Sequence, residues 1–504
     1  MLTVANGRTR FATNISNLAA NGTLGRTPIT ANSANVRFSL SDGFAARDVK
    51  VALGEPSART NFAINMLAGQ FGEAITGTLT GGAGQIANVP LLIDEAAGNW
   101  RYLNNVLTLD GSLRVLDAAE VDRFQPMAVP DMMLALENSV ITAIGQIIEP
   151  KTGRKVADVD IRHVLDDSSG RALLAVDGLR FDDTLQPELL TPLTLGVVAN
   201  VDGAVSGDGR IEWDANGVRS TGRFATRDMN LAAAFGPVDG LTTEIVFTDL
   251  LGLETGPGQQ AFLASVNPGI PALNGKIGYR LLSGQRIAVE AGRWPFAGGE
   301  LMLEPTTLDF GVEAERRLTF RVVGVDAEKL LGEYDFENLR VTGIFDGILP
   351  MVFDKDGGRI VGGALVSRPG GGEVSYLGEL AYQDMGVFAN YAFDALKSIR
   401  YNQLTIGVGG NIDGEIITDI SFNGLQQGSL AKRNFITRQL ARIPIQFNVS
   451  VKAQFRQLIG SIRGIYDPQY AADRDLQFLL SQQNGTLPVT GEEPSKTKDE
   501  PQHE

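Results

Sequence analysis

The residues best suited to chemistry gather around His163, one of two histidines in a chain of 504 residues that has no cysteine. Asp158, Asp160, Asp166 and Asp167 flank it, and carboxylates with an imidazole are donors that bind metal ions. Alternation in this segment predicts a strand with the first two aspartates on its outward face. We therefore interpret the cluster as a solvated acidic surface and predict no metal site. The other histidine lies in a polar tail, so a zinc site or a catalytic triad lacks its second partner.

Two glycine-rich segments share composition with phosphate-binding loops, at residues 207–210 (Gly-Asp-Gly-Arg) and 368–372 (Arg-Pro-Gly-Gly-Gly). A phosphate loop needs a following helix N-terminus and usually a Gly-Lys-Ser/Thr ending, and both segments lack that ending. We interpret both as hairpin turns. Paired carboxylates for glycoside hydrolysis would come from distant strands, and nothing in the sequence marks a pair. The sequence therefore predicts no catalytic residue, no cofactor and no enzymatic activity.

The charge balance argues against nucleic acid as a partner. The chain has 44 Lys plus Arg and 59 Asp plus Glu, a net charge of −15, whereas nucleic-acid binding needs a basic face. Residues 429–463 are the exception, with seven basic residues and no acidic one. This segment is a candidate contact for lipid head groups or an anionic membrane, and the alternative is an ordinary solvated surface. The candidate residues are Lys432, Arg433, Arg438, Arg442, Arg456 and Arg463.

Period-2 alternation of apolar and polar residues dominates the chain and predicts half-buried antiparallel strands. The cleanest run is 445–453, and others are 111–116, 156–161, 171–176, 244–247, 286–290, 318–322, 404–408 and 416–422. Residues 120–140, with two prolines, are predicted to interrupt the strands with a short helix. Asp-Gly and Asn-Gly pairs suit tight hairpins, and they occur at 202–203, 208–209, 216–217, 239–240, 274–275, 356–357 and 413–414. The expected fold is a long meander in which glycine, at 59 residues, makes the turns.

Helices are expected mainly near the C-terminus. Residues 388–399 carry apolar side chains at helical spacing on one side and polar ones on the other, and a second amphipathic helix is expected from about residue 454. Residues 467–483 extend it after a break at Asp467-Pro468, and residues 484–504 have the composition of a disordered tail. No stretch approaches the ~18 to 20 apolar residues of a membrane span.

A meander with one apolar face must cover that face. It can close into a barrel, stack two sheets, or curl into a trough that a ligand fills. Few helices are expected in the first 380 residues, so we expect a mainly β fold in which a long curled antiparallel sheet forms an apolar groove for acyl chains. The candidate groove residues are Leu318, Phe320, Val322, Leu339, Val341, Phe345, Leu404, Ile406, Val408, Phe447, Val449 and Val451. The alternative for the last three strands is plain core beneath the C-terminal helices.

The C-terminal third resembles the end of the AsmA-like proteins, closest to their YdbH branch and more distantly TamB. The resemblance covers about residues 275–465 and rests on the order of several short motifs. These are the segments 345–350 (Phe-Asp-Gly-Ile-Leu-Pro), 359–366, 368–376, 395–401, 404–409, 413–415, 422–424 (Phe-Asn-Gly) and 442–449 (Arg-Ile-Pro-Ile-Gln-Phe-Asn-Val). One departure is residues 425–441, which are longer and more basic than the family's link before its Pro-Ile strand.

This resemblance implies a bridge across the periplasm of a Gram-negative cell envelope. Such a bridge is anchored in the inner membrane by an N-terminal segment that this sequence does not contain. It passes phospholipids along an apolar groove toward the outer membrane, where a small lipoprotein adds strands to an open sheet edge. The C-terminal domain of this branch also carries the older label of a dicarboxylate transport domain. The expected division is sheet modules over residues 1–275, a YdbH-like C-terminal domain over 276–466, a helical extension over 467–483 and the tail over 484–504.

Two other functions remain open from the sequence. A structural or adhesive secreted β-solenoid would also be acidic, rich in glycine and free of cysteine, and a strict repeat would favour it. A polysaccharide-active enzyme on a β scaffold would require catalytic carboxylates that the sequence does not mark. Lipid species, direction of transport and number of strands do not follow from the sequence.

Overall fold

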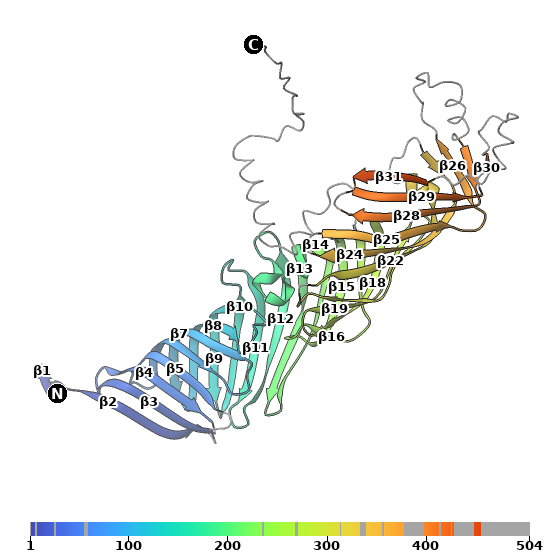
Figure 1. Ribbon diagram of the computed structural model, residues 1–504. Coiled ribbons are helices and arrows are strands. Elements are labelled where there is room, and N and C mark those ends of the chain that lie inside the picture. Colours follow the sequence, from blue (N-terminus) through green and yellow to red (C-terminus); the bar gives the residue numbers. More distant parts are fainter. Residues whose placement is uncertain are drawn as a thin grey trace, which may run out of the picture.

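The computed structural model describes most of the first 376 residues and parts of the remainder. The described residues are 2–5, 8–24, 27–54, 59–233, 236–267, 271–312, 314–332, 339–354, 357–376, 398–412, 415–424, 426–427 and 448–454. They form an elongated, curled sheet (Figure 1). The end of the amphipathic helix predicted at 388–399 is wrong, because Ser398 and Ile399 pair as a strand in β27 (Ser398–Tyr401). The rest of that helix, the helix predicted from about 454 beyond Gln454, the helical extension and the tail lie outside these residues.

One antiparallel sheet runs through nearly all of the described chain, which confirms the expected mainly β fold. Its first part comprises β1 (Leu2–Ala5), β2 (Arg8–Leu24), β3 (Thr27–Ser39), β4 (Gly43–Leu53), β5 (Thr60–Gln70), β6 (Ile75–Gln85), β7 (Leu91–Leu103), β8 (Val106–Asp117), β9 (Met127–Glu137), β10 (Val140–Ile148), β11 (Lys155–Val164), β12 (Ser169–Phe181) and β13 (Val198–Asp214). Its second part comprises β14 (Gly217–Ala233), β15 (Gly236–Asp249), β16 (Glu254–Thr255), β17 (Gln259–Val266), β18 (Ala272–Leu282), β19 (Arg286–Phe296), β20 (Gly299–Leu303), β21 (Thr306–Asp309), β22 (Arg316–Asp326), β24 (Ile344–Asp354), β25 (Gly357–Ser367), β28 (Gln403–Asn411), β29 (Glu415–Asn423) and β31 (Asn448–Gln454).

Strands that follow one another in the chain pair with one another, as the turn-punctuated alternation predicts. β13 pairs with β12 and β14, for example, and β22 pairs with β20 and β24. Among the described strands, β1 and β31 do not pair with each other, so the sheet is open. The division predicted at residue 275 remains a prediction, and the sheet continues through that point in β18.

A second, smaller sheet lies near β25 and β28 (Figure 1). It contains β23 (Leu339–Val341), β26 (Gly372–Tyr376), β27 (Ser398–Tyr401) and β30 (Gln426–Gln427). Helical elements within the described residues are short: α1 (Ala327–Gly332) and two 3-10 turns, η1 (Pro187–Leu189) and η2 (Pro192–Thr194). None of the helices that the structure describes is both long and apolar enough to cross a membrane.

Many strands bend near their middle, and the bend turns the sheet into a curled structure. Asn17 in β2, Asp48 in β4 and Glu95 in β7 all have positive φ angles (54°, 52° and 52°) inside strands. Such residues mark β-bulges, which bend a strand. The extra residue shifts the alternation by one, so that side chains beyond the bulge point to the opposite face from the one that strict alternation gives. In β4, accordingly, Ala46 and Val49 are both buried although they are three residues apart. We call the row of these positions the bend line; it divides each of the bulged strands into two arms.

Several predicted turns are wrong, and glycine has a different role there. The pairs at 202–203, 208–209, 239–240 and 274–275 lie inside β13, β15 and β18. Gly207 and Gly275 lie under the rings of Phe224 and Trp294, where a Cβ would overlap the aromatic side chain. Gly240 has a φ of 63° at a bulge. Glycine inside these strands therefore makes room for a cross-strand aromatic ring or allows the bend.

The helix predicted within residues 120–140 is also wrong. Residues 118–126 form a loop, and 127–137 form strand β9. Met127, Val129 and Met132 are buried by packing on one face of the sheet. This long-range burial determines the local structure more strongly than the prolines do.

Candidate functional site

One face of the sheet is apolar along most of its length, and we call it the inner face. Register places Phe44, Gly69, Gly77, Trp100 and Leu109 opposite one another on β4 to β8. The same row continues through Leu134, Ala143, Ile161, Ala172 and Ile211 on β9 to β13. An uninterrupted apolar row across ten strands is a surface that water solvates poorly.

The inner face of β2–β9 is only partly covered by protein. Leu18 and Tyr102 are 39% and 40% exposed, although both point to this face. Trp100 and Leu109 are half-buried. Exposed apolar patches of this kind mark binding surfaces in soluble proteins. We call this part, the inner face of β2–β9, the open apolar face.

Aromatic rings line one arm of the open apolar face. The rings of Phe38 and Phe44 lie 5.6 and 6.1 Å from that of Phe71, and the ring of Phe44 lies 6.2 Å from that of Trp100. The indole Nε1 of Trp100 donates a hydrogen bond to the carbonyl oxygen of Ala68 at 3.1 Å. The polar atom of the tryptophan is thus satisfied by the backbone, and the ring presents an apolar surface.

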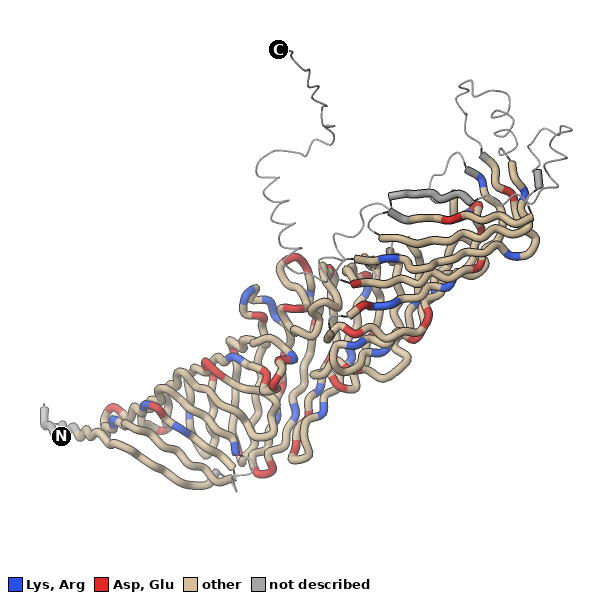
Figure 2. The backbone as a smooth tube through the Cα atoms, in the orientation of Figure 1, with Lys and Arg blue, Asp and Glu red and all other residues tan. Residues whose placement is uncertain are grey.

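The outer face carries the charge. Arg114 binds Asp94 across β7 and β8 at 2.7 Å, and Arg223 binds Glu244 across β14 and β15 at 2.6 Å. The hydrogen bond from Arg114 holds the pKa of Asp94 below its ordinary value. Acidic and basic residues are intermixed along the described chain (Figure 2). Exposed pairs of this kind contribute little to stability. The outer face also exposes apolar side chains such as Met133, which is 52% exposed, so its difference from the inner row is that it carries the charge.

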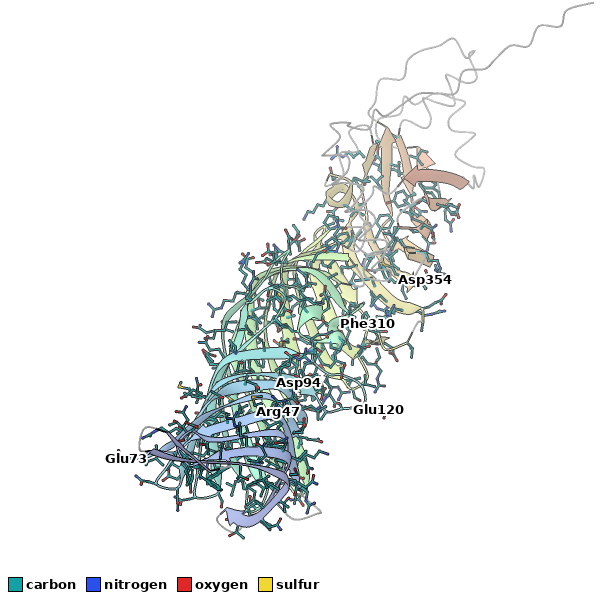
Figure 3. All side chains as sticks on the ribbon, turned by 90° about the vertical axis from the view of Figure 1, so that its left-hand side faces the viewer. Arg47, Glu73, Asp94, Glu120, Phe310 and Asp354 are labelled. Atoms are coloured by element: carbon teal, nitrogen blue, oxygen red, sulfur yellow. The ribbon has the colours of Figure 1, made fainter. Side chains whose placement is uncertain are left out.

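Hairpin loops alternate between two rims of the sheet. Loops 86–90 and 118–126 lie on one rim, and loops 71–74, 165–168 and 283–285 lie on the other. In Figure 3, Glu73 and Glu120, from opposite rims, lie on opposite sides of the sheet, whereas Phe310 lies on the side of Glu120. Twist along the sheet therefore carries the second rim toward the first.

The two rims meet in the middle of the molecule. Thr27 Oγ1 donates to Asp166 at 2.9 Å, and Asn88 Nδ2 donates to the carbonyl of Ser168 at 3.4 Å. Val89, from the first rim, packs with Trp213 on the inner face. The open apolar face therefore ends where loop side chains of one rim reach the inner face of β11–β13.

Beyond this point the inner face becomes a packed core. Trp294 is 1% exposed and lies in one cluster with residues from β15 to β25. Three predicted groove residues belong to it: Leu318, Phe320 and Val322 are 1%, 3% and 3% exposed, and Val408 packs against it half-buried. We call this cluster the closed core.

The other predicted groove residues divide between a second cluster and undescribed positions. Phe345 and Leu404 are buried with Tyr401 beside the smaller sheet, and Val341 and Ile406 pack against them. The side chains of Leu339, Val449 and Val451, residue Phe447, and the candidate basic residues between 432 and 463 lie outside the described part. The assignment of these residues to a groove remains a prediction.

Residues of the acidic cluster around His163 make hydrogen bonds and an ion pair with neighbouring side chains of the sheet. His163 is buried on the inner face, and its Nδ1 accepts a hydrogen bond from Trp213 Nε1 at 3.0 Å. Burial lowers the pKa of His163. Asp158 pairs with Lys155 at 2.6 Å, and Asp167 accepts from Ser169 at 2.7 Å. Within the described residues, no group of three or more metal-ligating side chains forms.

The open apolar face was missed by the sequence analysis, which placed the groove in the late strands. Its signal was present in the alternation of Leu107 and Leu109 with threonine and aspartate. Nothing local distinguishes an alternating strand whose inner face stays open from one that is packed. The difference arises from the twist and the bends of the sheet, which bring other strands and loops over the inner face at some strands and not at others.

The chain matches the family model YdbH-like, described as intermembrane phospholipid transport protein YdbH, over residues 3–477. The chain belongs to the YdbH-like family. The match covers the whole sheet, well beyond the motifs at 275–465. No curated protein and no solved structure matches the chain. The YdbH-like family is one of lipid transport and is not known as enzymatic.

Proposed function

We propose that this chain carries phospholipids between two membranes, with acyl chains on the inner face and head groups at the rims. The observation that carries the proposal is the open apolar face of β2–β9, opposite a charged outer face. The inner row from Phe44 to Ile211 contains no charged residue, so it suits hydrocarbon and offers nothing to an ionised head group. Membership in a family of intermembrane phospholipid transport supports this assignment.

The physical effect is shielding of hydrocarbon from water. Each methylene kept out of water is worth about 0.8 kcal/mol, so a 16-carbon chain gains roughly 12 kcal/mol. A lipid bound on the inner face can therefore cross an aqueous gap without exposing both chains. Direction would come from another component, because the sequence contains no nucleotide-binding motif.

The dimensions of the strands fit this use. β4 spans Gly43–Leu53 and bends at Asp48, which leaves five residues on each side. At ~3.3 Å per residue each arm is about 17 Å deep. One leaflet of a bilayer is about 15 Å of hydrocarbon, half of ~30 Å. Each arm is thus deep enough for one acyl chain that points from the rim toward the bend line.

The proposed setting is the periplasm of a Gram-negative cell envelope. Phospholipid is the proposed cargo, and a small outer-membrane lipoprotein that adds a strand to a free sheet edge is the proposed partner. The basic residues between Lys432 and Arg463 remain proposed head-group contacts. The inner-membrane anchor remains a prediction from the family resemblance.

The test is the lipid content of the purified chain. Under mild extraction, native mass spectrometry should show bound phospholipid, with a mass shift that disappears after delipidation. Protein with no bound phospholipid, and no uptake of phospholipid from vesicles after delipidation, would count against the proposal.

A further inference from the structure

The two rims that border the open apolar face are built differently. On the second rim, the hairpins of β3–β8 close in short turns at residues 40–42, 71–74 and 104–105. On the first rim, loops 86–90 and 118–126 are held against other parts of the described chain. Val89 is buried beside Trp213, and the backbone N–H of Gln125 donates to the carbonyl of Leu190 at 2.9 Å.

Large apolar side chains are exposed on successive hairpins of the second rim. Leu40 and Phe71, in the turns themselves, are 69% and 47% exposed, and Tyr102, two residues before the next turn, is 40% exposed. Phe11, whose carbonyl accepts a hydrogen bond from the N–H of Leu40 at 3.3 Å, is 38% exposed. We call these four residues the lip.

The lip is continuous with the open apolar face. The ring of Phe71 lies 5.6 Å from that of Phe38 and 6.1 Å from that of Phe44, and both of these lie on the inner face. Tyr102 pairs with Leu107 on the neighbouring strand, so the row of the sheet nearest this rim is apolar as well. An apolar surface thus runs from the exposed turns onto the inner face.

The side chains of the lip suit the boundary between water and hydrocarbon. Tyr102 combines an apolar ring with a hydroxyl that donates to Asn105 Oδ1 in the turn at 3.1 Å. Aromatic residues with one polar end concentrate at membrane interfaces. Asp42 and Glu73 lie in the turns of Leu40 and Phe71, so an anionic membrane surface would repel these turns. A surface of zwitterionic head groups would not.

We propose that the lip is a contact surface for a phospholipid bilayer with zwitterionic head groups, from which lipids move sideways onto the open apolar face. This inference rests on the proposed function. An acyl chain that leaves a bilayer through water exposes all of its methylenes. A chain that leaves across the lip stays against Leu40, Phe71 and then the inner face. The transfer requires no change in the fold, because the lip is exposed and already meets that face.

The test substitutes the most exposed residue of the lip. Leu40→Asp places a charge on the lip and leaves the strands of the open apolar face unchanged, since Leu40 lies in a turn. Val121→Asp is the matched control, because Val121 is 75% exposed in a loop of the first rim. Its neighbour Glu120 lies on the opposite side of the sheet from Glu73 of the second rim (Figure 3). Leu40→Phe keeps an apolar side chain of a different shape.

Two measurements use the full chain and vesicles of phosphatidylethanolamine and phosphatidylcholine. Flotation gives the affinity for the vesicles, and a fluorescent phospholipid in them gives the rate of uptake. We expect at least tenfold weaker flotation and at least tenfold slower uptake for Leu40→Asp, with Val121→Asp and Leu40→Phe equal to the unmodified chain. Affinity for dihexanoyl-phosphatidylcholine dispersed as monomers should be the same in all four proteins.

Several results would overturn the lip while leaving the proposed function intact. These are equal flotation and uptake for Leu40→Asp and the unmodified chain, or equal losses in Leu40→Asp and Val121→Asp. Loss in Leu40→Phe as well would indicate a contact that depends on shape, as with a protein partner. An unmodified chain that stays off the vesicles and forms a dimer that Leu40→Asp dissociates would assign the lip to a second copy. Failure of the unmodified chain to bind the monomeric lipid would instead overturn the proposed function and the lip with it.

Discussion

Leu109→Glu is expected to weaken lipid binding about 100-fold without unfolding the protein. Leu109 lies in the middle of the open apolar face, between Trp100 and Leu134. It is half-buried, so in the lipid-free protein a glutamate carboxylate there can reach water. A bound acyl chain would cover that carboxylate. A charge in a hydrocarbon environment costs about 3 kcal/mol on insertion scales, which corresponds to roughly 100-fold weaker binding.

The assay is binding of a fluorescent phospholipid by the purified chain, with circular dichroism and urea unfolding to show that the fold is kept. Thr108→Glu is the matched control, because the neighbouring residue points to the outer face. It should bind lipid as the unmodified chain does. Equal affinity of Leu109→Glu and the unmodified chain, or equal losses in both variants, would refute the assignment of acyl chains to this face.

Four further variants test packing and burial. Phe320→Asp places a charge in the closed core and should lower the free energy of unfolding by roughly 4 kcal/mol or more; a urea midpoint close to the unmodified one would contradict this burial. Gly275→Ala should destabilise the chain by overlap with Trp294, whereas Gly332→Ala, whose Cβ meets nothing within 4 Å, should be nearly neutral in the same measurement. Burial lowers the pKa of His163 in the folded protein. The stability that its neutral form contributes is therefore fully present above the ordinary histidine pKa of about 6.5 and is lost as the pH falls below that value. The urea midpoint should therefore drop between pH 7.5 and 5.5, and His163→Gln should flatten that slope; an unchanged slope would show that another group is responsible.

Much of the sheet follows from its sequence because alternation is a local signal. Runs such as 156–161, 171–176 and 318–322 are strands in β11, β12 and β22, and the alternation also gives the inward face correctly. Neighbour pairing follows from turns such as Asn216-Gly217. These features depend on a few adjacent residues, so the sequence contains them directly.

Long-range features could not be read in the same way. Gly207 looks like a turn residue, but its position is decided by Phe224 on the next strand. Phe320 and Leu109 have the same alternating surroundings, yet one is in the closed core and the other on the open apolar face. Which of the two a strand joins depends on twist and bends summed over many strands.

The central claim is that acyl chains lie on the inner face of the early strands, and labelling along β7 tests it most directly. Benzoylphenylalanine is placed in turn at Asn99, Trp100, Arg101 and Tyr102, and the full chain is irradiated with phospholipid bound. The account predicts lipid adducts at 100 and 102 and none at 99 and 101, a period of two that follows the strand. Adducts at all four positions, or only at 99 and 101, would contradict it.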